Sequence, residues 1–290
     1  MAVDPAWIWY TDLGCSEQAV GIWMSEYLSK IKSPADVKRL GPVELERLAE
    51  EIRERLIRGV AKTGGHIGPN LGVVELTLAM HYVFDTPRDS FVFDVSHQSY
   101  VHKLLTGREH RFDTIRQPDG LNGFMLRTES EHDSFGAGHA GTALSAGLGM
   151  AVARDMSGGD ENIVVLAGDA AFTNGISFEA LNNIASQTKR FIIILNDNEW
   201  SIDKNVGAIA EYFHKIATNP TYVSIHERVS GLLEKFGGKA ARHIARKAEE
   251  AAKGIVGRGM IFEEFGLSYY GPVDGHNLPL LIETLKFLKT

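Results

Sequence analysis

Two short apolar runs stand out in the middle of the chain, at residues 163–167 and 191–195. Polar residues follow each run: Asp169 lies just after the first, and Asn198 lies just beyond the second. The segment between the runs has the composition of a helix. A strand, a helix and a second strand of this length form a crossover unit, which predicts two parallel strands in one sheet.

The N-terminal third of the chain predicts two helices. Ser33 followed by Pro34 is typical of a helix start, because serine caps the free N–H groups and proline suits the first turn. A second helix follows Pro42 and ends at the glycine pair that begins with Gly64. Its apolar residues recur at three- and four-residue spacing and form one stripe, made of Leu45, Leu48, Ile52, Leu56 and Val60.

Four further segments complete the expected layering. A short buried strand is predicted at 91–95, turning into a helix at Ser96, and a helix of small residues at 140–153. Near the end, a strand is predicted at 265–270 and an apolar helix at 278–288. The alternation of strands and helices predicts an α/β fold in which helices flank a parallel sheet.

Composition narrows the class of protein. A length of 290 residues with 44% hydrophobic residues suffices for one large domain or two smaller ones. The net charge of −7 argues against a nucleic-acid partner. The single cysteine, Cys15, excludes an internal disulfide and fits a reducing compartment, so a cytoplasmic location is expected. No secretory signal and no long apolar run is present in the sequence, so no membrane partner is expected.

The polar residues after the two apolar runs suggest a site. Ligands of parallel sheets bind beyond the carboxyl ends of the strands, where Asp169 and Asn198 lie 29 positions apart. Their oxygen atoms suit a hard cation such as Mg²⁺, which takes its remaining ligands from phosphate and water. The backbone at Ala170 and Ala171 would then face the phosphates.

These residues carry a resemblance to a known family. GDA at 168–170 followed by NDN at 196–198 resembles the thiamine diphosphate motif, which is GDG and then Asn after about thirty residues. The words FEALNN, LNDNEWSI and GPVDGHN are similar to those of 1-deoxy-D-xylulose-5-phosphate synthase, a transketolase relative. The resemblance covers nearly all of residues 33–290 and implies a thiamine diphosphate-binding domain of the transketolase N-terminal type. Residues 1–32 are then an N-terminal arm, and about 203–258 a helical insertion that tends to be mobile in the family.

The resemblance implies roles for individual residues. Asp169 and Asn198 would hold Mg²⁺, helped by the backbone carbonyl of Trp200. His97 would lie near the diphosphate, and His66 above the thiazolium ring. The residues expected to bind the cofactor are His97, Gly138, His139, Ala140, Asp169, Ala170, Ala171 and Asn198, and those expected to act in catalysis are His66, His97 and His276, with Asp274 facing the substrate beside His276.

Four positions depart from the family's words. Ser96 and Ala170 each replace a glycine, and Ala140 and Gly141 replace the two serines of a GHSS loop. If those hydroxyls bond the cofactor, each loss costs about 0.5–1.5 kcal/mol. Ala170 fits its position without strain only if its φ is negative.

Other polar residues are interpreted as structural. His81 lies in an apolar helix and is expected to pack there. His102 and His110 are expected at the solvated surface. The acidic loop is expected to be a solvated face and not a metal site; it contains Glu129, Glu131 and Asp133.

The implied reaction condenses pyruvate with glyceraldehyde 3-phosphate to 1-deoxy-D-xylulose 5-phosphate. In the family, the glutamate that bonds the aminopyrimidine ring comes from a pyrimidine-binding domain, and that domain and the C-terminal domain are absent from these 290 residues. A partner protein carrying the missing domain, a homodimer, or both are therefore expected, and the isolated chain is predicted to be inactive. Two alternatives are a subunit of a split transketolase acting on another sugar phosphate, and a degenerate, non-catalytic paralogue that binds a partner protein.

Overall fold

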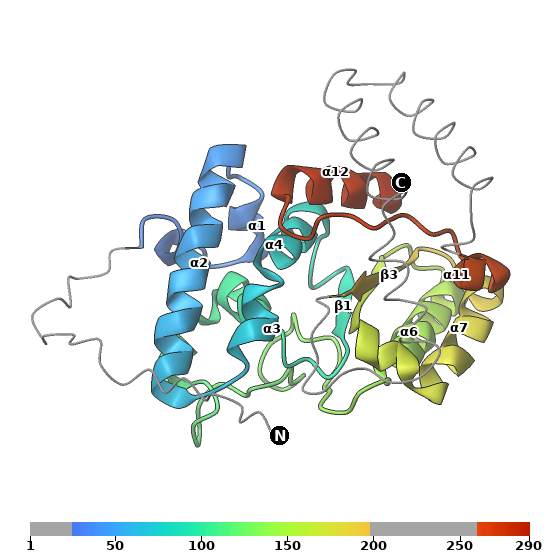
Figure 1. Ribbon diagram of the computed structural model, residues 1–290, viewed down its shortest axis with the longest axis horizontal. Helices are drawn as coiled ribbons and strands as arrows, with labels where there is room; N and C mark the ends of the chain where they lie inside the picture. The colour runs from blue at the N-terminus through green and yellow to red at the C-terminus, as the bar shows by residue number, and fades with distance from the viewer. Residues whose placement is uncertain (1–24, 198–259) are drawn as a thin grey trace, which may run out of the picture.

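The computed structural model describes residues 25–197 and 260–290 of the chain. At its centre, the described part has a three-stranded parallel sheet in the order β1-β2-β3 (Figure 1). The strands are β1 (Ser90–Phe93), β2 (Ile163–Gly168) and β3 (Phe191–Asn196). Helix α7 (Gly175–Gln187) connects β2 to β3, which confirms the predicted strand–helix–strand unit.

Alternate residues of the strands face opposite sides of the sheet, and both sides are covered. Val164 and Leu166 of β2 belong to one buried cluster, whereas Val165 and Ala167 belong to a second cluster on the other side. Because both faces are buried, the strands are continuous apolar runs and do not alternate with polar residues.

One side of the sheet is covered by helices from both ends of the chain. These are α1 (Pro34–Val37), α2 (Pro42–Thr63), α4 (Val74–Val83) and α12 (Leu278–Lys289), and α12 packs along α4 (Figure 1). The predicted stripe of α2 is buried against this layer. The predicted helix ends are also confirmed, with Ser33 in a capping box at the start of α1 and Gly64 at the end of α2.

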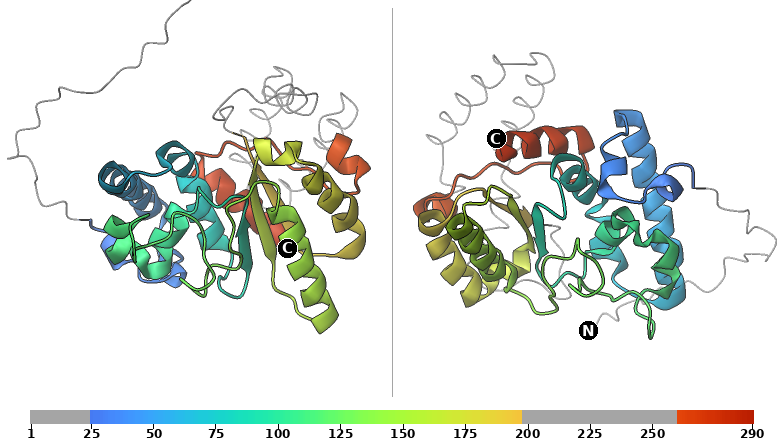
Figure 2. Two further views of the ribbon diagram at one scale, coloured as in Figure 1. Left: turned by 90° about the horizontal axis from the view of Figure 1, so that it is seen from below. Right: turned by 180° about the vertical axis from the view of Figure 1, so that it is seen from behind.

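The opposite side is covered by α6 (Ala143–Ser157), α7 and α11 (Met260–Glu264), as Figure 2 shows. Short elements join the layers: η2 (Leu28–Lys30), α3 (Ile67–Leu71), α5 (Tyr100–Lys103), η3 (Leu104–Arg108), η4 (Glu109–Thr114) and η5 (Asp169–Thr173). None of the helices within 25–197 and 260–290 combines the length and the apolar character that a bilayer crossing requires.

Two predicted elements differ from the structure. The prediction of a strand at 265–270 was wrong, because Gly266 closes the C-terminal turn of α11 in a left-handed conformation, with φ of 79°. Its N–H donates to the carbonyl of Glu263, and the side chains of Leu267 and Tyr269 then pack on the second cluster without strand pairing. The helix expected from Ser96 begins only at 100, as α5.

The last residues of the expected arm are attached to α2. The carboxylate of Glu51 accepts hydrogen bonds from the backbone N–H groups of Glu26, Tyr27 and Leu28 at 2.8–3.2 Å. Leu28 is fully buried beside them. The rest of the arm and the expected insertion at 203–258 lie outside the described residues, so the proposed domain boundaries stay predictions.

Candidate functional site

The ends of β2 and β3 lie side by side. Gly168 and Asn196 are register partners, and the half-buried Asp169 follows Gly168 directly as the first residue of η5. The other two expected metal ligands, Asn198 and Trp200, lie outside the described residues. Within the described ranges, no group of three His, Cys, Asp or Glu side chains could hold a metal ion. The magnesium site at Asp169 therefore stays a prediction, based on one carboxylate, one amide and one carbonyl.

The two alanines after Asp169 fit the turn in which they lie. Ala170 is exposed and Ala171 is buried. Ala170 is not among the described residues with positive φ, so it holds its backbone without the strain that a left-handed conformation would cause. The replacement of the family's glycine by Ala170 is thus compatible with this backbone.

The loop before α6 is tied to the end of β1 by a buried carboxylate. Asp94, only 2% exposed, accepts hydrogen bonds from the N–H groups of Gly141 at 2.9 Å and Ala143 at 3.1 Å. Burial raises the pKa of the Asp94 carboxyl, although these backbone donors oppose the rise. Sequence reasoning missed Asp94, and its place directly after a buried strand was the available signal.

The same loop leaves its first residues exposed. Gly138, His139 and Ala140 are exposed, whereas Gly141 is buried with φ of 83°. A Cβ on Gly141 would lie 2.8 Å from the Cβ of Asn174, so a serine there is disfavoured by both space and backbone conformation. The backbone conformation of this loop therefore requires the glycine at 141, which replaces the family's second serine.

His66 and His97 lie together, and Asn70 joins the loops that carry them. Their ring centroids are 5.3 Å apart in an edge-on arrangement. The fully buried Asn70 donates to the carbonyl of His66 at 2.6 Å and to that of His97 at 2.8 Å, and accepts from the N–H of Tyr100 at 2.8 Å. Asn70 was missed in the sequence, where it appears as one more polar residue in a glycine-rich loop.

Both rings of this pair are held neutral at physiological pH. Burial, followed by the nearby His66, lowers the pKa of His97 to about 4. Burial and the charge of Arg116 lower the pKa of His66. Within the described residues, Nδ1 of His97 is buried without a hydrogen-bond partner. Because α5 begins three residues later, at Tyr100, His97 does not lie at a helix N-terminus.

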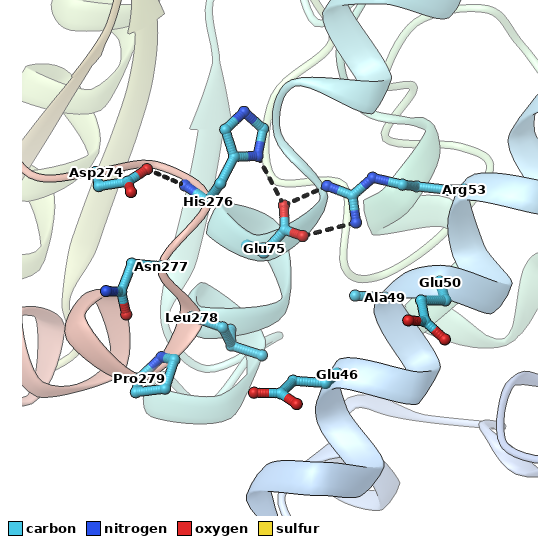
Figure 3. Close-up of a pocket in the computed structure, with 10 residues that line it drawn as sticks. All are labelled: Glu46, Ala49, Glu50, Arg53, Glu75, Asp274, His276, Asn277, Leu278 and Pro279. Atoms are coloured by element: carbon cyan, nitrogen blue, oxygen red, sulfur yellow. Dashed lines mark hydrogen bonds and ion pairs between the residues drawn. The ribbon is translucent and has the colours of Figure 1, made fainter.

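His276 lies against a different pair of side chains. Its Nδ1 is 3.2 Å from Oε2 of Glu75, whose carboxylate also pairs with Arg53 (Figure 3). These residues line an open cleft of about 590 Å³ between α2 and the start of α12. The backbone N–H of His276 donates to Oδ1 of Asp274 at 2.9 Å, so a hydrogen bond links these two residues of the GPVDGHN segment.

The predictions for His102 and for two of the three acidic loop residues, Glu129 and Asp133, were wrong. His102 is fully buried, and its Nε2 lies 3.1 Å from Oδ1 of Asp133, which is itself buried. Glu129 is also nearly buried and pairs with Lys103 and Arg108. Glu129 and Asp133 therefore neutralise buried cations, whereas Glu131 is exposed, as expected. The expectations for His81, fully buried in α4, and for His110, exposed, are confirmed.

Most of the chain matches one family of known proteins. A family model described as 1-deoxy-D-xylulose-5-phosphate synthase matches residues 28–290. The chain belongs to this family. A synthase of that name from Acidobacterium capsulatum is 71% identical over 266 residues, which are 92% of this chain and 42% of the relative. One from Methylacidiphilum infernorum is 65% identical over 266 residues, again covering 92% of this chain and 42% of the relative.

Solved structures show the same fold at lower identity. A transketolase from Campylobacter jejuni has a TM-score of 0.59 and 20% identity, covering 86% of this chain and 36% of that protein. A transketolase mutant from Pichia stipitis has a TM-score of 0.58 and 17% identity, covering 84% and 34%. The predicted fold class, a transketolase-like α/β domain, is thus confirmed.

Membership of the synthase family confirms the resemblance carried by the motifs. The chain spans 42% of the length of the Acidobacterium and Methylacidiphilum synthases. The roles of individual residues towards cofactor and substrate stay predictions, and they belong to the proposal that follows.

Proposed function

We propose that this chain is the diphosphate-binding half of a 1-deoxy-D-xylulose-5-phosphate synthase that uses thiamine diphosphate and Mg²⁺. The complete enzyme would condense pyruvate with glyceraldehyde 3-phosphate. The observation that carries the proposal is the 71% identity with a synthase over 266 residues, which include both strand ends of the GDA and NDN words.

The described end of the sheet fits a metal-bound diphosphate. The register of Gly168 with Asn196 supports a site shared by Asp169 and Asn198, since both follow strands that end at the same edge. Their oxygen atoms, with the carbonyl of Trp200, are donors that Mg²⁺ prefers. In this proposal these three residues would hold the ion.

The diphosphate has candidate donors from two loops. The buried, unpartnered Nδ1 of His97 is a polar atom that a phosphate oxygen could satisfy, if Nδ1 carries the proton. The exposed loop at 138–140 and the turn at 170–171 would offer backbone N–H groups. Gly141 and Ala143 would not contribute theirs, because these N–H groups already donate to Asp94.

The histidines of the chain would handle protons near the reacting atoms. When bound, thiamine diphosphate supplies the carbon nucleophile that takes a two-carbon unit from pyruvate. His66 and His97 stay neutral because burial lowers the pKa of each, so each ring keeps one nitrogen that can accept a proton. His276 would bind or orient the substrate from the side of α12.

Catalysis would also need the protein that corresponds to the rest of the relatives' length. We propose that a pyrimidine-binding domain, on a partner protein or in a longer chain, completes the site, with or without a second copy of this chain. Residues 1–290 alone should therefore show no turnover of pyruvate. The expected location is the cytoplasm, where the substrates of such an enzyme would be found.

Calorimetry with thiamine diphosphate and Mg²⁺ tests the proposal. The chain is titrated alone and in a mixture with the part of the Acidobacterium synthase that it does not match. Binding that Asp169→Asn abolishes, and that the exposed carboxylate variant Glu179→Gln leaves unchanged, supports the proposed site. Absence of heat in both titrations would contradict it and favour the non-catalytic paralogue.

Turnover by the mixture distinguishes the synthase hypothesis from the split-transketolase hypothesis. Product formation from pyruvate and glyceraldehyde 3-phosphate supports the synthase. Turnover only with other sugar phosphates would favour a split transketolase. Turnover of pyruvate by residues 1–290 alone would overturn the prediction that the isolated chain is inactive.

A further inference from the structure

Glu75 connects a partly buried ion pair with Arg53 to the exposed side chain of His276. Glu75, only 8% exposed, lies at the start of α4, and its carboxylate lies between Arg53 of α2 and His276 of the segment before α12 (Figure 3). We propose that Glu75 is a positioning residue that fixes the ring orientation and the Nδ1–H tautomer of His276. The proposal deepens the proposed function and rests on it for the role of His276, but its geometry does not depend on the cofactor.

The carboxylate of Glu75 is itself held in place. Arg53 binds it through both terminal nitrogens, with 2.6 Å from Nη1 to Oε1 and 2.7 Å from Nη2 to Oε2. Burial alone would raise the pKa of Glu75, but the hydrogen bonds from Arg53 and His276 outweigh burial and lower it. A bidentate guanidinium–carboxylate pair is planar and directional, so Glu75 is an ionised acceptor with a fixed orientation.

An ionised carboxylate can only accept hydrogen bonds, and this decides the proton on His276. Because Oε2 of Glu75 accepts from Nδ1 at 3.2 Å, Nδ1 must carry the hydrogen, and in the neutral ring Nε2 is then unprotonated. The backbone is fixed as well, since Asp274 accepts from the N–H of His276, and Asn277 caps α12 through Leu280.

The fixed tautomer gives the ring a defined face for a ligand. The side chain of His276 is 63% exposed, and its second nitrogen is turned away from Glu75 (Figure 3). Nε2 is therefore offered as an acceptor for a ligand hydroxyl or for a proton. Without Glu75, the exposed ring of His276 would exchange between tautomers and rotamers. Ligand binding would then have to restrict the ring, and the entropy cost of that restriction would weaken the interaction.

NMR of the chain labelled with ¹³C and ¹⁵N at histidine tests the tautomer directly. The His276 ring is assigned by the signals that His276→Gln removes, and its two nitrogen shifts report which one is protonated near neutral pH. The expected result is an Nδ1–H ring in the unaltered chain, and a tautomer ratio changed by about tenfold or more in Glu75→Gln. Glu50→Gln removes a carboxylate from the α2 wall of the same cleft and should leave the ratio unchanged.

The tautomer of His276 is measured in the unaltered chain, so this measurement tests the proposal even if Glu75→Gln fails to fold. A predominant Nε2–H ring would overturn the proposal, as would a folded Glu75→Gln chain with an unchanged ratio. Failure of cofactor binding in calorimetry would contradict the proposed function but would not affect the tautomer measured for His276. The two proposals can therefore fail independently.

A double-mutant cycle in the complemented enzyme separates positioning from a merely structural effect. Loss of a carboxylate that orients a histidine typically lowers activity by roughly 10–100-fold in metal sites, and a loss of that order in kcat/KM is expected for Glu75→Gln. If Glu75 acts through His276, Glu75→Gln has no further effect in a His276→Gln background. Additive losses would contradict the assignment.

Discussion

Nε2 of His102 donates a hydrogen bond to Oδ1 of Asp133 across 3.1 Å, and both side chains are fully buried. Asp133 is an ionised acceptor, because both terminal nitrogens of Arg108 also bind it at 2.9 Å. Nδ1 of His102 must then accept from Nε2 of His81, 3.0 Å away. The chain of bonds fixes both tautomers and ties the loop that carries Asp133 to the core.

This arrangement predicts a loss of stability in mild acid. Burial, partly opposed by Asp133, lowers the pKa of His102 to about 4 from an ordinary value of 6.5. As the pH falls from 6.5 towards 4, the unfolded chain binds a proton that the folded chain does not, so folding stability falls. Between pH 7 and pH 5, His102 should account for about 2 kcal/mol of lost stability. Urea unfolding at the two values measures it.

The variant His102→Gln isolates this contribution. Its amide can still donate to Asp133 but does not titrate, so its loss between pH 7 and pH 5 should be smaller by about 2 kcal/mol. The depressed pKa of Asp133 does not interfere, because its contribution is lost only as the pH falls below the ordinary value of 3.8. His110→Gln, at an exposed histidine, should behave like the unaltered chain. Equal losses in all three proteins would refute the assignment.

Much of the fold could be predicted because it is encoded locally. The runs at 163–167 and 191–195 have the length of buried strands, and the apolar stripe of the 22-residue helix α2 repeats at helical spacing. The strand expected at 265–270 failed because the turn at Gly266 uses its first residues to close α11. Leu267 and Tyr269 do pack on the second cluster, as alternate residues of a strand would, but no strand pairing forms there.

The site was only partly predictable because its decisive contacts are remote in sequence. His66 and His97 were identified from their loops, yet Asn70, which joins those loops, has no signal of its own. His102 lies 31 positions from Asp133, and no periodic pattern in the sequence indicates that the two side chains pair. A buried carboxylate and an exposed one look alike in a sequence until the partner that neutralises the charge is placed.

Removal of the Asn70 side chain should destabilise the loops that carry the two histidines. Asn70→Ala leaves two carbonyls and the N–H of Tyr100 without their partner, at a cost of roughly 2–4 kcal/mol in the free energy of unfolding. Asn183, whose amide bonds the backbone at the surface of α7, is the matched control. Asn183→Ala should change stability by less than about 0.5 kcal/mol. Similar urea midpoints for the two variants would contradict the role given to Asn70.

Ser96 has two opposing effects on stability: its backbone is strained, and its side chain forms a buried hydrogen bond. Its φ is 66°, a left-handed conformation that costs a non-glycine residue about 1–2 kcal/mol, but its hydroxyl accepts from the buried N–H of Met125 at 2.9 Å. Ser96→Ala keeps the strain and loses the bond, so it should destabilise by about 1–3 kcal/mol. Ser96→Gly loses the bond and relieves the strain, so it should be more stable than Ser96→Ala by about 1–2 kcal/mol. Thermal unfolding of the two variants measures this order, and the reverse order would show that strain is negligible there.

Two glycines of α6 should respond to alanine with opposite signs. A Cβ on Gly147 would lie 2.6 Å from Cγ2 of Val165 and 3.2 Å from the ring of Phe191, because α6 packs closely on β2 and β3 there. Gly147→Ala should therefore destabilise by about 1–3 kcal/mol. Gly149, on another face of the same helix, has nothing within 4 Å of its Cβ position, and Gly149→Ala should stabilise by about 0.5–1 kcal/mol through helix propensity. Urea unfolding of both variants is the measurement, and a gain from Gly147→Ala would mean that the helix and the sheet are not in close contact at this point.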